Sequence, residues 1–207
     1  MSGSLTLYVV RHGEVFNPHN VWYGRLPGFR LSDVGRHQAL MAGRALKDKS
    51  ISTFYCSPMQ RTQETAQLVI SQHSSDFEVI IEERINEVFA PFEGVLNTTL
   101  EKTMFDIYTG NEAPHELPAD LRKRALSFIG DLRKRHSGEE VAMVTHGDVV
   151  VALFMWAKQQ AESDIGRGRL IDLGLPEYYP ATASISTFTF ATDDPDEIPQ
   201  YAYLRPY

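Results

Sequence analysis

The chain has 207 residues, of which 43% are hydrophobic and 23% are charged. This composition suits one folded domain and excludes an intrinsically disordered chain. The 27 acidic and 20 basic residues give a formal net charge of −7, which argues against general binding to nucleic acid or to an anionic membrane. We therefore expect any bound anion to be held by a few locally concentrated cations.

Cys56 is the only cysteine, so the chain cannot close a disulfide within itself or form a cysteine-rich zinc site. This cysteine usage indicates a reducing compartment, and we predict a cytoplasmic protein. The first apolar run, residues 5–10, has no basic residue before it and leads directly into Arg11, which argues against a signal peptide. The longest apolar run, residues 149–157, is shorter than the roughly 20 residues that a bilayer requires. The sequence carries no signal for an oligomeric state.

Strand and helix signals alternate along the chain. Short apolar or alternating runs predict strands over residues 5–10, 51–56, 78–81, 141–144, 184–190 and 201–204. Capping residues and helical apolar spacing predict helices over residues 33–49, from Pro58 as a first residue, near 98–108, over 121–132 and directly after His146. Residues 110–118 and 166–180 are predicted loops. This order predicts a single α/β domain over residues 1–207, a three-layer sandwich with a mostly parallel central sheet.

Residues with catalytic potential follow three of the predicted strands. Arg11 and His12 end the first strand, Arg61 lies one turn into the helix after the second, and His146-Gly147 follow the strand over residues 141–144. Ligands of such sheets bind at the carboxyl ends of the strands, so we expect these residues to converge on one edge. Two guanidinium groups around a small pocket match a phosphate group, and the helix that begins near Gly147 adds backbone N–H donors.

The same edge has the residue types that phosphoryl transfer needs. A neutral histidine is a nucleophile toward phosphorus and forms phosphohistidine as a covalent intermediate. A carboxylic acid nearby can protonate the leaving oxygen, and the segment after the third strand holds Glu82, Glu83 and Glu87. This chemistry needs no metal ion and no other cofactor.

The segment from Leu7 to Asn17, with Arg11-His12-Gly13-Glu14 at its centre, resembles the R-H-G signature of the histidine phosphatase superfamily, which includes the cofactor-dependent phosphoglycerate mutases. Four further blocks resemble the family's blocks in the same order, and they are Gly24-Arg25 with Leu31-Ser32, Gly35 and Gln38-Ala39; Ser57-Pro58 with Arg61-Thr62 and Thr65-Ala66; Arg84-Ile85-Asn86-Glu87 with Phe92-Glu93-Gly94; and Val144-Thr145-His146-Gly147. Five ordered blocks are much more specific than R-H-G alone.

The resemblance implies a metal-independent phosphatase that acts on a small organic phosphate monoester. It implies that His12 takes up the phosphoryl group and that Glu87 protonates the leaving oxygen, together with Arg11, Arg61 and His146 as catalytic residues. It also implies a substrate-binding set of side chains and backbone groups, namely Arg11, Asn17, Gly24, Arg61, His146 and Gly147. The stretch after Glu87 is shorter than in the family, so Glu83 and Glu93 are alternative proton donors.

Two other functions fit the same residues. A mutase would return the phosphoryl group to a substrate hydroxyl, but mutases of this family carry a longer insertion between the acid and the second histidine. The segment between Glu87 and His146 is short, which favours hydrolysis. An inactive binding module would be expected to have lost part of the pocket, and every expected pocket residue is present.

Several residues also have plainer interpretations. Glu87 lies in an acidic stretch that could be a solvated face, and a zinc site formed by His12, Glu14 and His146 is disfavoured by the neighbouring arginines. Arg167 and Arg169 either reach over the mouth of the site or belong to a surface loop. The aromatic residues of segments 16–30 and 89–92 predict an organic substrate moiety larger than a bare sugar.

Overall fold

The computed structural model describes residues 3–162 and 167–207, apart from the side chains of residues 167 and 168. Six strands form one sheet in the order β3-β2-β4-β1-β5-β6. The strands are β1 (Leu5–Arg11), β2 (Ile51–Cys56), β3 (Val79–Ile81), β4 (Glu140–Thr145), β5 (Ile185–Phe190) and β6 (Gln200–Leu204). The pairs β3-β2, β2-β4 and β4-β1 are parallel, whereas β5 runs antiparallel to both β1 and β6. The predicted mostly parallel α/β sheet is confirmed.

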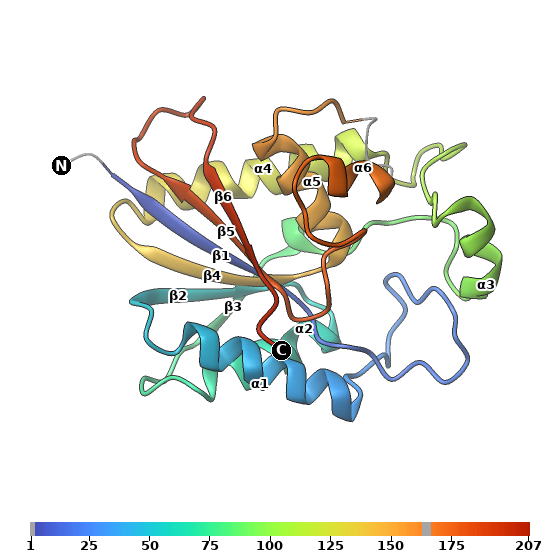
Figure 1. The fold of residues 1–207 in the computed structure, drawn as a ribbon, viewed down its shortest axis with the longest axis horizontal. Coiled ribbons are helices and arrows are strands. Elements are labelled where there is room, and N and C mark those ends of the chain that lie inside the picture. The colour runs from blue at the N-terminus through green and yellow to red at the C-terminus, as the bar shows by residue number, and fades with distance from the viewer. Residues whose placement is uncertain (1–2, 163–166) are drawn as a thin grey trace.

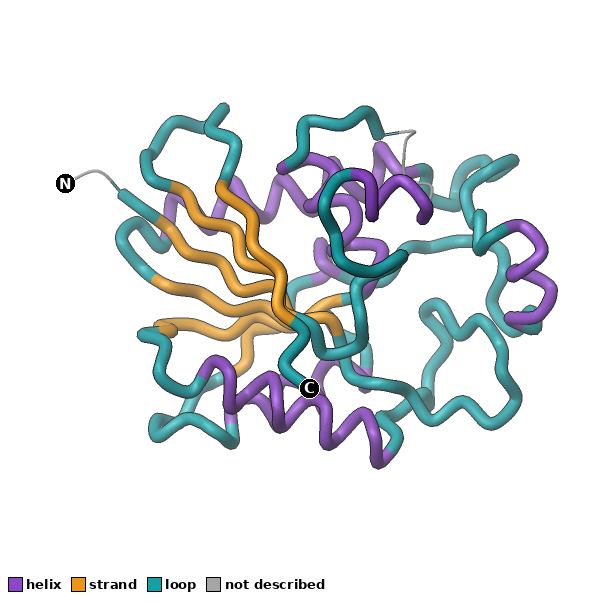
Figure 2. Tube along the Cα trace, viewed as in Figure 1, coloured by secondary structure: helices purple, strands orange, loops and turns teal. Residues whose placement is uncertain are grey.

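Helices cover both faces of this sheet (Figures 1 and 2). The α-helices are α1 (Asp33–Leu46), α2 (Gln60–Ile70), α3 (Asn97–Leu100), α4 (Pro118–Arg135), α5 (Gly147–Ala157) and α6 (Arg167–Asp172). Two 3-10 helices, η1 (Glu83–Ile85) and η2 (Glu101–Thr103), lie between β3 and α4. No helix within the described ranges is long and apolar enough to cross a membrane.

The alternating side-chain directions of β1 explain the two layers of core. Leu7 and Val9 point into the cluster that α4 and α5 cover, whereas Tyr8 and Val10 point into the cluster that α1 and α2 cover. α1 begins where Ser32 accepts a hydrogen bond from the N–H of Gly35, as its N-cap position predicts. Figure 1 shows these two helix pairs on opposite sides of the sheet.

Three helix predictions need correction. The helix predicted from Pro58 begins two residues later, at Gln60, because Met59 keeps an extended backbone. The helix predicted near residues 98–108 is limited to α3 and η2, because Met104 and Phe105 adopt positive φ angles of 52° and 58°. The first helix ends at Leu46 and is thus shorter than the predicted 33–49.

The predicted loop over residues 166–180 contains the helix α6. Its residue Leu170 is fully buried and, together with Leu175, packs against Phe154 and Met155 of α5. Burial of these two leucines stabilises a helical turn that the glycines and arginines of the segment concealed in the sequence.

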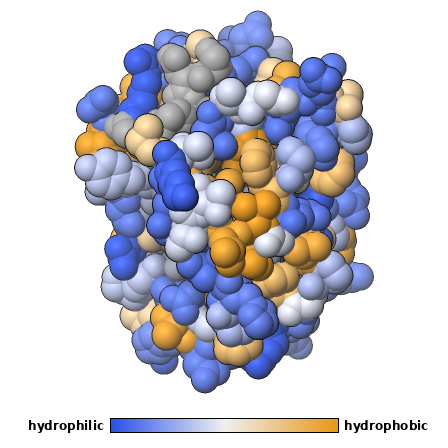
Figure 3. Space-filling model, turned by 90° about the vertical axis from the view of Figure 1, so that its right-hand side faces the viewer, coloured by the Kyte–Doolittle hydropathy of each residue, from blue (hydrophilic) through white to orange (hydrophobic). Residues whose placement is uncertain are grey.

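The carboxyl ends of β1 and β4 lie side by side, since Arg11 pairs with Thr145 in the parallel register. The loop after β1 and the segment that carries α3 extend beyond this edge (Figure 1). Figure 3 looks onto this face of the molecule, where apolar side chains gather near the middle and hydrophilic ones surround them. The topology therefore brings the ends of the two central strands to one exposed face.

Candidate active site

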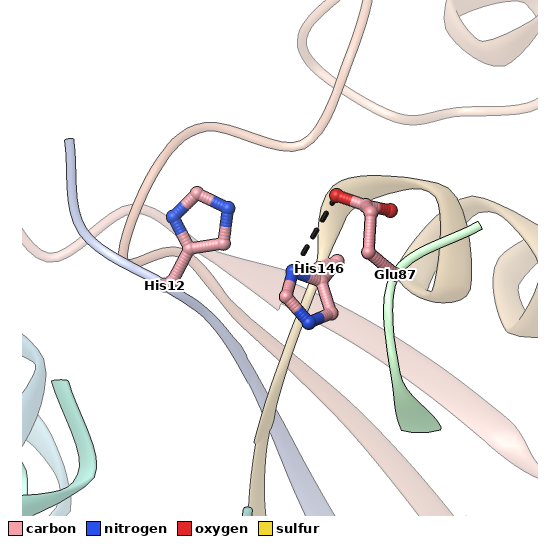
Figure 4. A group of neighbouring side chains, drawn as sticks. All are labelled: His12, Glu87 and His146. Carbon is pink, nitrogen blue, oxygen red and sulfur yellow. Dashed lines mark ion pairs between the residues drawn. The ribbon is translucent and has the colours of Figure 1, made fainter. Parts of the chain in front are cut away.

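His12 follows β1 and is almost completely buried, at 1% exposure. Its Nδ1 lies 2.8 Å from the carbonyl oxygen of Gly13, which can only accept, so Nδ1 carries the proton and Nε2 has the lone pair. Burial and the charges of Arg61 and Arg11 hold the pKa of His12 well below its ordinary value. His12 is therefore a neutral imidazole, and Figure 4 shows its free nitrogen on the side of Glu87 and His146.

His146 is the N-cap of α5 and has no exposed surface. Its Nδ1 accepts a hydrogen bond of 3.1 Å from Nη2 of Arg61, so its proton lies on Nε2, which is 2.7 Å from Oγ of Ser57. Burial and the charge of Arg61 lower the pKa of His146 well below its ordinary value. His146 is thus neutral in the free protein, with Nδ1 on the side of Glu87 (Figure 4).

Arg61 is buried in the first turn of α2, at 1% exposure. Its Nη2 donates to the carbonyl of Gly24 at 2.8 Å, and its guanidinium carbon lies 4.8 Å from the centre of the Tyr23 ring. The ring face of a tyrosine attracts a cation, so Tyr23 supports the buried charge. Among the described residues, Nε of Arg61 has no hydrogen-bond partner, which is unusual for a buried guanidinium.

Arg11 provides the second guanidinium. Its Nη1 donates to the carbonyl of Pro180, and its guanidinium carbon lies 4.8 Å from the centre of the Tyr179 ring. Tyr179 also covers the start of α5, where a Cβ on Gly147 would lie only 2.3 Å from the ring. Glycine at position 147 therefore permits the ring to sit against the helix and under Arg11.

Glu87 follows η1 and is 7% exposed. Its Oε2 lies 3.4 Å from Nδ1 of His146 (Figure 4) and 3.5 Å from Nη2 of Arg61. Burial and the nearby charge of Asp148 raise the pKa of Glu87 to about 7, although the charge of Arg61 opposes this. A large fraction of Glu87 thus carries a proton near neutral pH.

A cavity of about 320 Å³ opens beside these groups. Its lining combines charged, aromatic and aliphatic side chains, which are Arg11, Val21, Trp22, Tyr23, Gly24, Glu87, Asn97, Phe105, Ile107, Asp148 and Tyr179. This volume is at the lower end of the range for small-molecule sites. Arg11 is the cation in this lining, and Arg61 and His146 lie beside it, against Glu87. The cavity can hold a small organic group at its aromatic end, with an anionic group toward Arg11 and Glu87.

The structure also places the alternatives to Glu87. Glu83 is exposed and accepts a hydrogen bond from Nδ2 of Asn86, whereas Glu93 accepts one from the N–H of Arg25. Both carboxylates serve local structure, whereas Glu87 is the glutamate that lies against Arg61 and His146.

Asn17, the predicted neutral donor, binds the backbone of its own loop. Its amide exchanges hydrogen bonds with the backbone of Val21 and so closes the loop after β1. Gly24 lines the cavity, but its carbonyl accepts from Arg61. Arg169 is exposed and donates to Gln160, and the side chain of Arg167 lies outside the described residues.

A metal site is a poor description of this cluster. His12, Glu87 and His146 offer ligand atoms within 4.8 Å of one another, whereas Glu14 is exposed and accepts from Ser32. The guanidinium of Arg61 already occupies the space beside His146 and Glu87, and a metal cation there would be repelled by it. The donor set thus fits an anion between cations better than a metal ion.

Asp148, Tyr108 and Tyr179 contribute to the site although the sequence did not single them out as functional. The carboxylate of Asp148 accepts from the hydroxyl of Tyr108 at 3.0 Å and from that of Tyr179 at 2.7 Å. The sequence feature that could have indicated a role for Asp148 is its position directly after His146-Gly147. The two tyrosines belong to distant loops, and nothing in the local sequence links them to the site.

The sequence profile of the Histidine phosphatase superfamily (branch 1) matches residues 7–193 of the chain. The chain therefore belongs to the histidine phosphatase superfamily, as its five sequence blocks predicted.

Relatives with different names are similar to this chain. Phosphoserine phosphatase 1 of Hydrogenobacter thermophilus is 33% identical over 150 residues, 68% of this chain and 70% of that protein. Phosphoglycerate mutase-like protein 4 of Arabidopsis thaliana is 31% identical over 172 residues, 75% of this chain and 72% of that protein. The solved structure of a mycobacterial glucosyl-3-phosphoglycerate phosphatase matches with a TM-score of 0.76 at 18% identity, over 97% of each chain. This structural likeness shows a common fold.

Proposed function

We propose that the protein is a phosphatase that hydrolyses a small organic phosphate monoester through a phosphohistidine. One observation carries the proposal: His12 is neutral, its Nε2 is unprotonated, and a carboxyl group with a raised pKa lies across the same cluster. Nucleophile and acid are thus in the protonation states that the first step requires. The family membership and the phosphatase-named relative support this choice.

The first step transfers the phosphoryl group to the protein. Nε2 of His12 attacks phosphorus, the bond between phosphorus and the ester oxygen breaks, and Glu87 gives its proton to that oxygen. Arg11 and Arg61 bind the oxygens of the transferring group and stabilise their charge, which is usually the largest contribution to phosphoryl transfer. The carbonyl of Gly13 holds Nδ1–H and stabilises the charge that develops on the imidazole.

The second step releases inorganic phosphate. Water attacks phosphorus, the bond between phosphorus and Nε2 breaks, and the Glu87 carboxylate accepts a proton from the water. His146 is neutral before substrate binds, and a bound dianion raises the pKa of a neighbouring imidazole. We therefore propose that His146 takes up a proton with the substrate and then donates from Nδ1 to the phosphoryl group.

We favour hydrolysis over phosphate return to the substrate, because the segment between Glu87 and His146 lacks the longer insertion that the resemblance associates with mutases of this family. The segment between Glu87 and α4 contains only the four-residue helix α3 and the short η2. The proposed chemistry requires neither a metal ion nor a cofactor, and the single buried Cys56 suits a cytoplasmic protein.

Rapid quenching of the protein during turnover of a radiolabelled phosphate ester tests this proposal. We expect label on the protein that is labile in acid and stable in base, absent from His12→Ala, and inorganic phosphate formed in equal amount to the alcohol. Acid-stable label, or label on His12→Ala, would contradict the phosphohistidine. Phosphate transfer to an added sugar acid in place of release would instead identify a mutase.

A further inference from the structure

The carboxylate of Asp148 lies between the two loops that border the cavity. Asp148 is in the first turn of α5 and is half-buried. Tyr108, in the segment after η2, and Tyr179, in the segment after α6, each donate a hydroxyl to it. Burial and the charge of Asp148 raise the pKa of Tyr108 well above its ordinary value, so this hydroxyl keeps its proton and donates. Asp148 thus joins both loops to the helix whose N-cap is His146.

Asp148 is connected to the phosphoryl end of the cavity through Tyr179. The hydroxyl of Tyr179 is fixed by the carboxylate at 2.7 Å, and the face of the same ring lies against the guanidinium of Arg11. Removal of this hydroxyl contact would loosen the ring, which orients Arg11 together with the carbonyl of Pro180. The first effect of Asp148 is therefore positional.

The second effect is electrostatic, since Asp148 and Glu87 line the same cavity. Charged and titratable groups face Glu87 from every element around it. They are Arg11 from β1, His12 directly after β1, Tyr23 from the loop after β1, Arg61 from α2, Tyr108 from the segment after η2, His146 at the N-cap of α5 and Asp148 from α5. Arg25 and Arg124 bind the backbone carbonyl of Glu87 from behind. Within this set, Asp148 is the carboxylate that opposes ionisation of Glu87, and the arginines favour it.

We propose that Asp148 is a positioning residue that keeps Glu87 in its acid form for the leaving oxygen and keeps Arg11 oriented through Tyr179. This inference rests on the proposed function, because it assigns Asp148 a role in proton donation by Glu87. A second carboxylate near the acid supplies the repulsion that a lone Glu87, surrounded by guanidinium groups, would lack.

The test compares two esters over a range of pH in wild type and Asp148→Asn. Asparagine keeps the shape and one of the two acceptor oxygens, replaces the other oxygen by an NH2 donor, and removes the charge. Glycerol 2-phosphate has a poor leaving group that needs a proton, whereas p-nitrophenyl phosphate does not. Wild-type kcat/KM on glycerol 2-phosphate should fall as the pH rises through about 7. In Asp148→Asn this fall should begin about one pH unit lower, a loss of about tenfold on the alkaline side. p-Nitrophenyl phosphate should show little of this change.

Three matched variants separate charge from structure. Tyr108→Phe and Asp148→Glu keep the negative charge and should keep the wild-type midpoint. Tyr179→Phe should also keep it but should raise KM for both esters, because Arg11 loses its oriented support. Thermal unfolding of each variant verifies that it is folded.

The outcomes distinguish failure of the proposed function from failure of the role of Asp148. If Glu87→Gln affects both esters equally, the proposed function fails whatever Asp148 does. If Glu87→Gln acts only on glycerol 2-phosphate but Asp148→Asn keeps the wild-type midpoint, the role of Asp148 alone is overturned. An equal shift of the midpoint in Tyr108→Phe would attribute the effect to hydrogen bonding and would also overturn the electrostatic role.

Discussion

Arg61 and Arg133 are both largely buried arginines against an aromatic ring, yet their surroundings differ. Arg133 lies 4.4 Å from the centre of the Phe190 ring. It donates to the carbonyls of Thr192, Asp194 and Pro195 and to the carboxylate of Glu197. Arg61 lies over Tyr23, and among the described residues its Nε has no acceptor. One guanidinium is bound by the protein itself, and the other retains donor capacity.

The cavity near Arg133 is larger than the cavity at the candidate site. The cavity at Arg133, between α4 and the turn before β6, has a volume of about 770 Å³ and a floor that includes Ile129 and Trp156. The cavity lined by Arg11 and Glu87 is about 320 Å³, and Arg61 contacts Glu87. The larger cavity is lined by Arg133, which donates several hydrogen bonds to the protein. The smaller cavity is lined by Arg11, whose buried Nε has no hydrogen-bond partner among the described residues. Incomplete compensation of buried charge, more than volume, thus marks the candidate site.

The largest expected effect tests the nucleophile at the small cavity. His12→Ala should lower kcat on p-nitrophenyl phosphate by on the order of 10⁴-fold or more, because no covalent route remains. The matched control is His136→Ala, which removes a histidine that contacts Tyr55 and Glu139 near the end of α4. The control should keep kcat within about twofold and lose only stability. Near-wild-type turnover by His12→Ala would refute the assignment.

Glu87→Gln should cost about 10²–10⁴-fold on alkyl phosphates and much less on p-nitrophenyl phosphate, because only the alkoxide needs a proton to leave. The pKa of Glu87 is raised to about 7, so the acid form is present below that pH and is lost above it. The alkaline fall of kcat/KM on alkyl esters should therefore disappear in the variant. The measurement is the ratio of the two kcat/KM values across pH, and equal losses on both esters would reduce Glu87 to a structural role.

The two arginines can be compared directly by substitution with lysine. Arg61→Lys should lower kcat/KM by about 10²–10³-fold, because a point charge cannot replace the guanidinium fork that binds the phosphoryl oxygens in the proposed mechanism. Arg133→Lys should change kcat/KM by less than about threefold. It should instead lower Tm, by about 2–4 °C for each kcal/mol by which the free energy of unfolding falls. Kinetics and thermal unfolding of both variants measure this contrast, and equal losses of activity would remove it.

Removal of metal ions is expected to have no effect on turnover. Steady-state turnover in excess EDTA should equal turnover without it, because Arg11 and Arg61 supply the positive charge that the phosphoryl group needs. A large loss that zinc or magnesium restores would show that the cluster of His12, Glu87 and His146 holds a metal ion, contrary to the repulsion expected from Arg61.

Much of the fold could be predicted because local patterns determine it. The apolar runs of β1 and β4 predict buried strands, and Val9 and Val10 lie in the two core clusters on opposite faces of the sheet. The order of the strands comes from the structure. The predictions failed where tertiary contacts override propensity. α6 forms because Leu170 packs on α5, and the helix after α3 stops at the left-handed Met104.

The sequence by itself determined that Arg11, His12 and His146 meet at one edge of the sheet. Arg11, His12 and His146 end adjacent parallel strands, and chain direction alone places such ends at one edge. Only the tertiary structure decided their chemical states. The lone pair of His12, the raised pKa of Glu87 and the link from Asp148 to Arg11 depend on burial and on loops far apart in the chain. Burial and electrostatic coupling are properties of three-dimensional proximity, which no local pattern specifies.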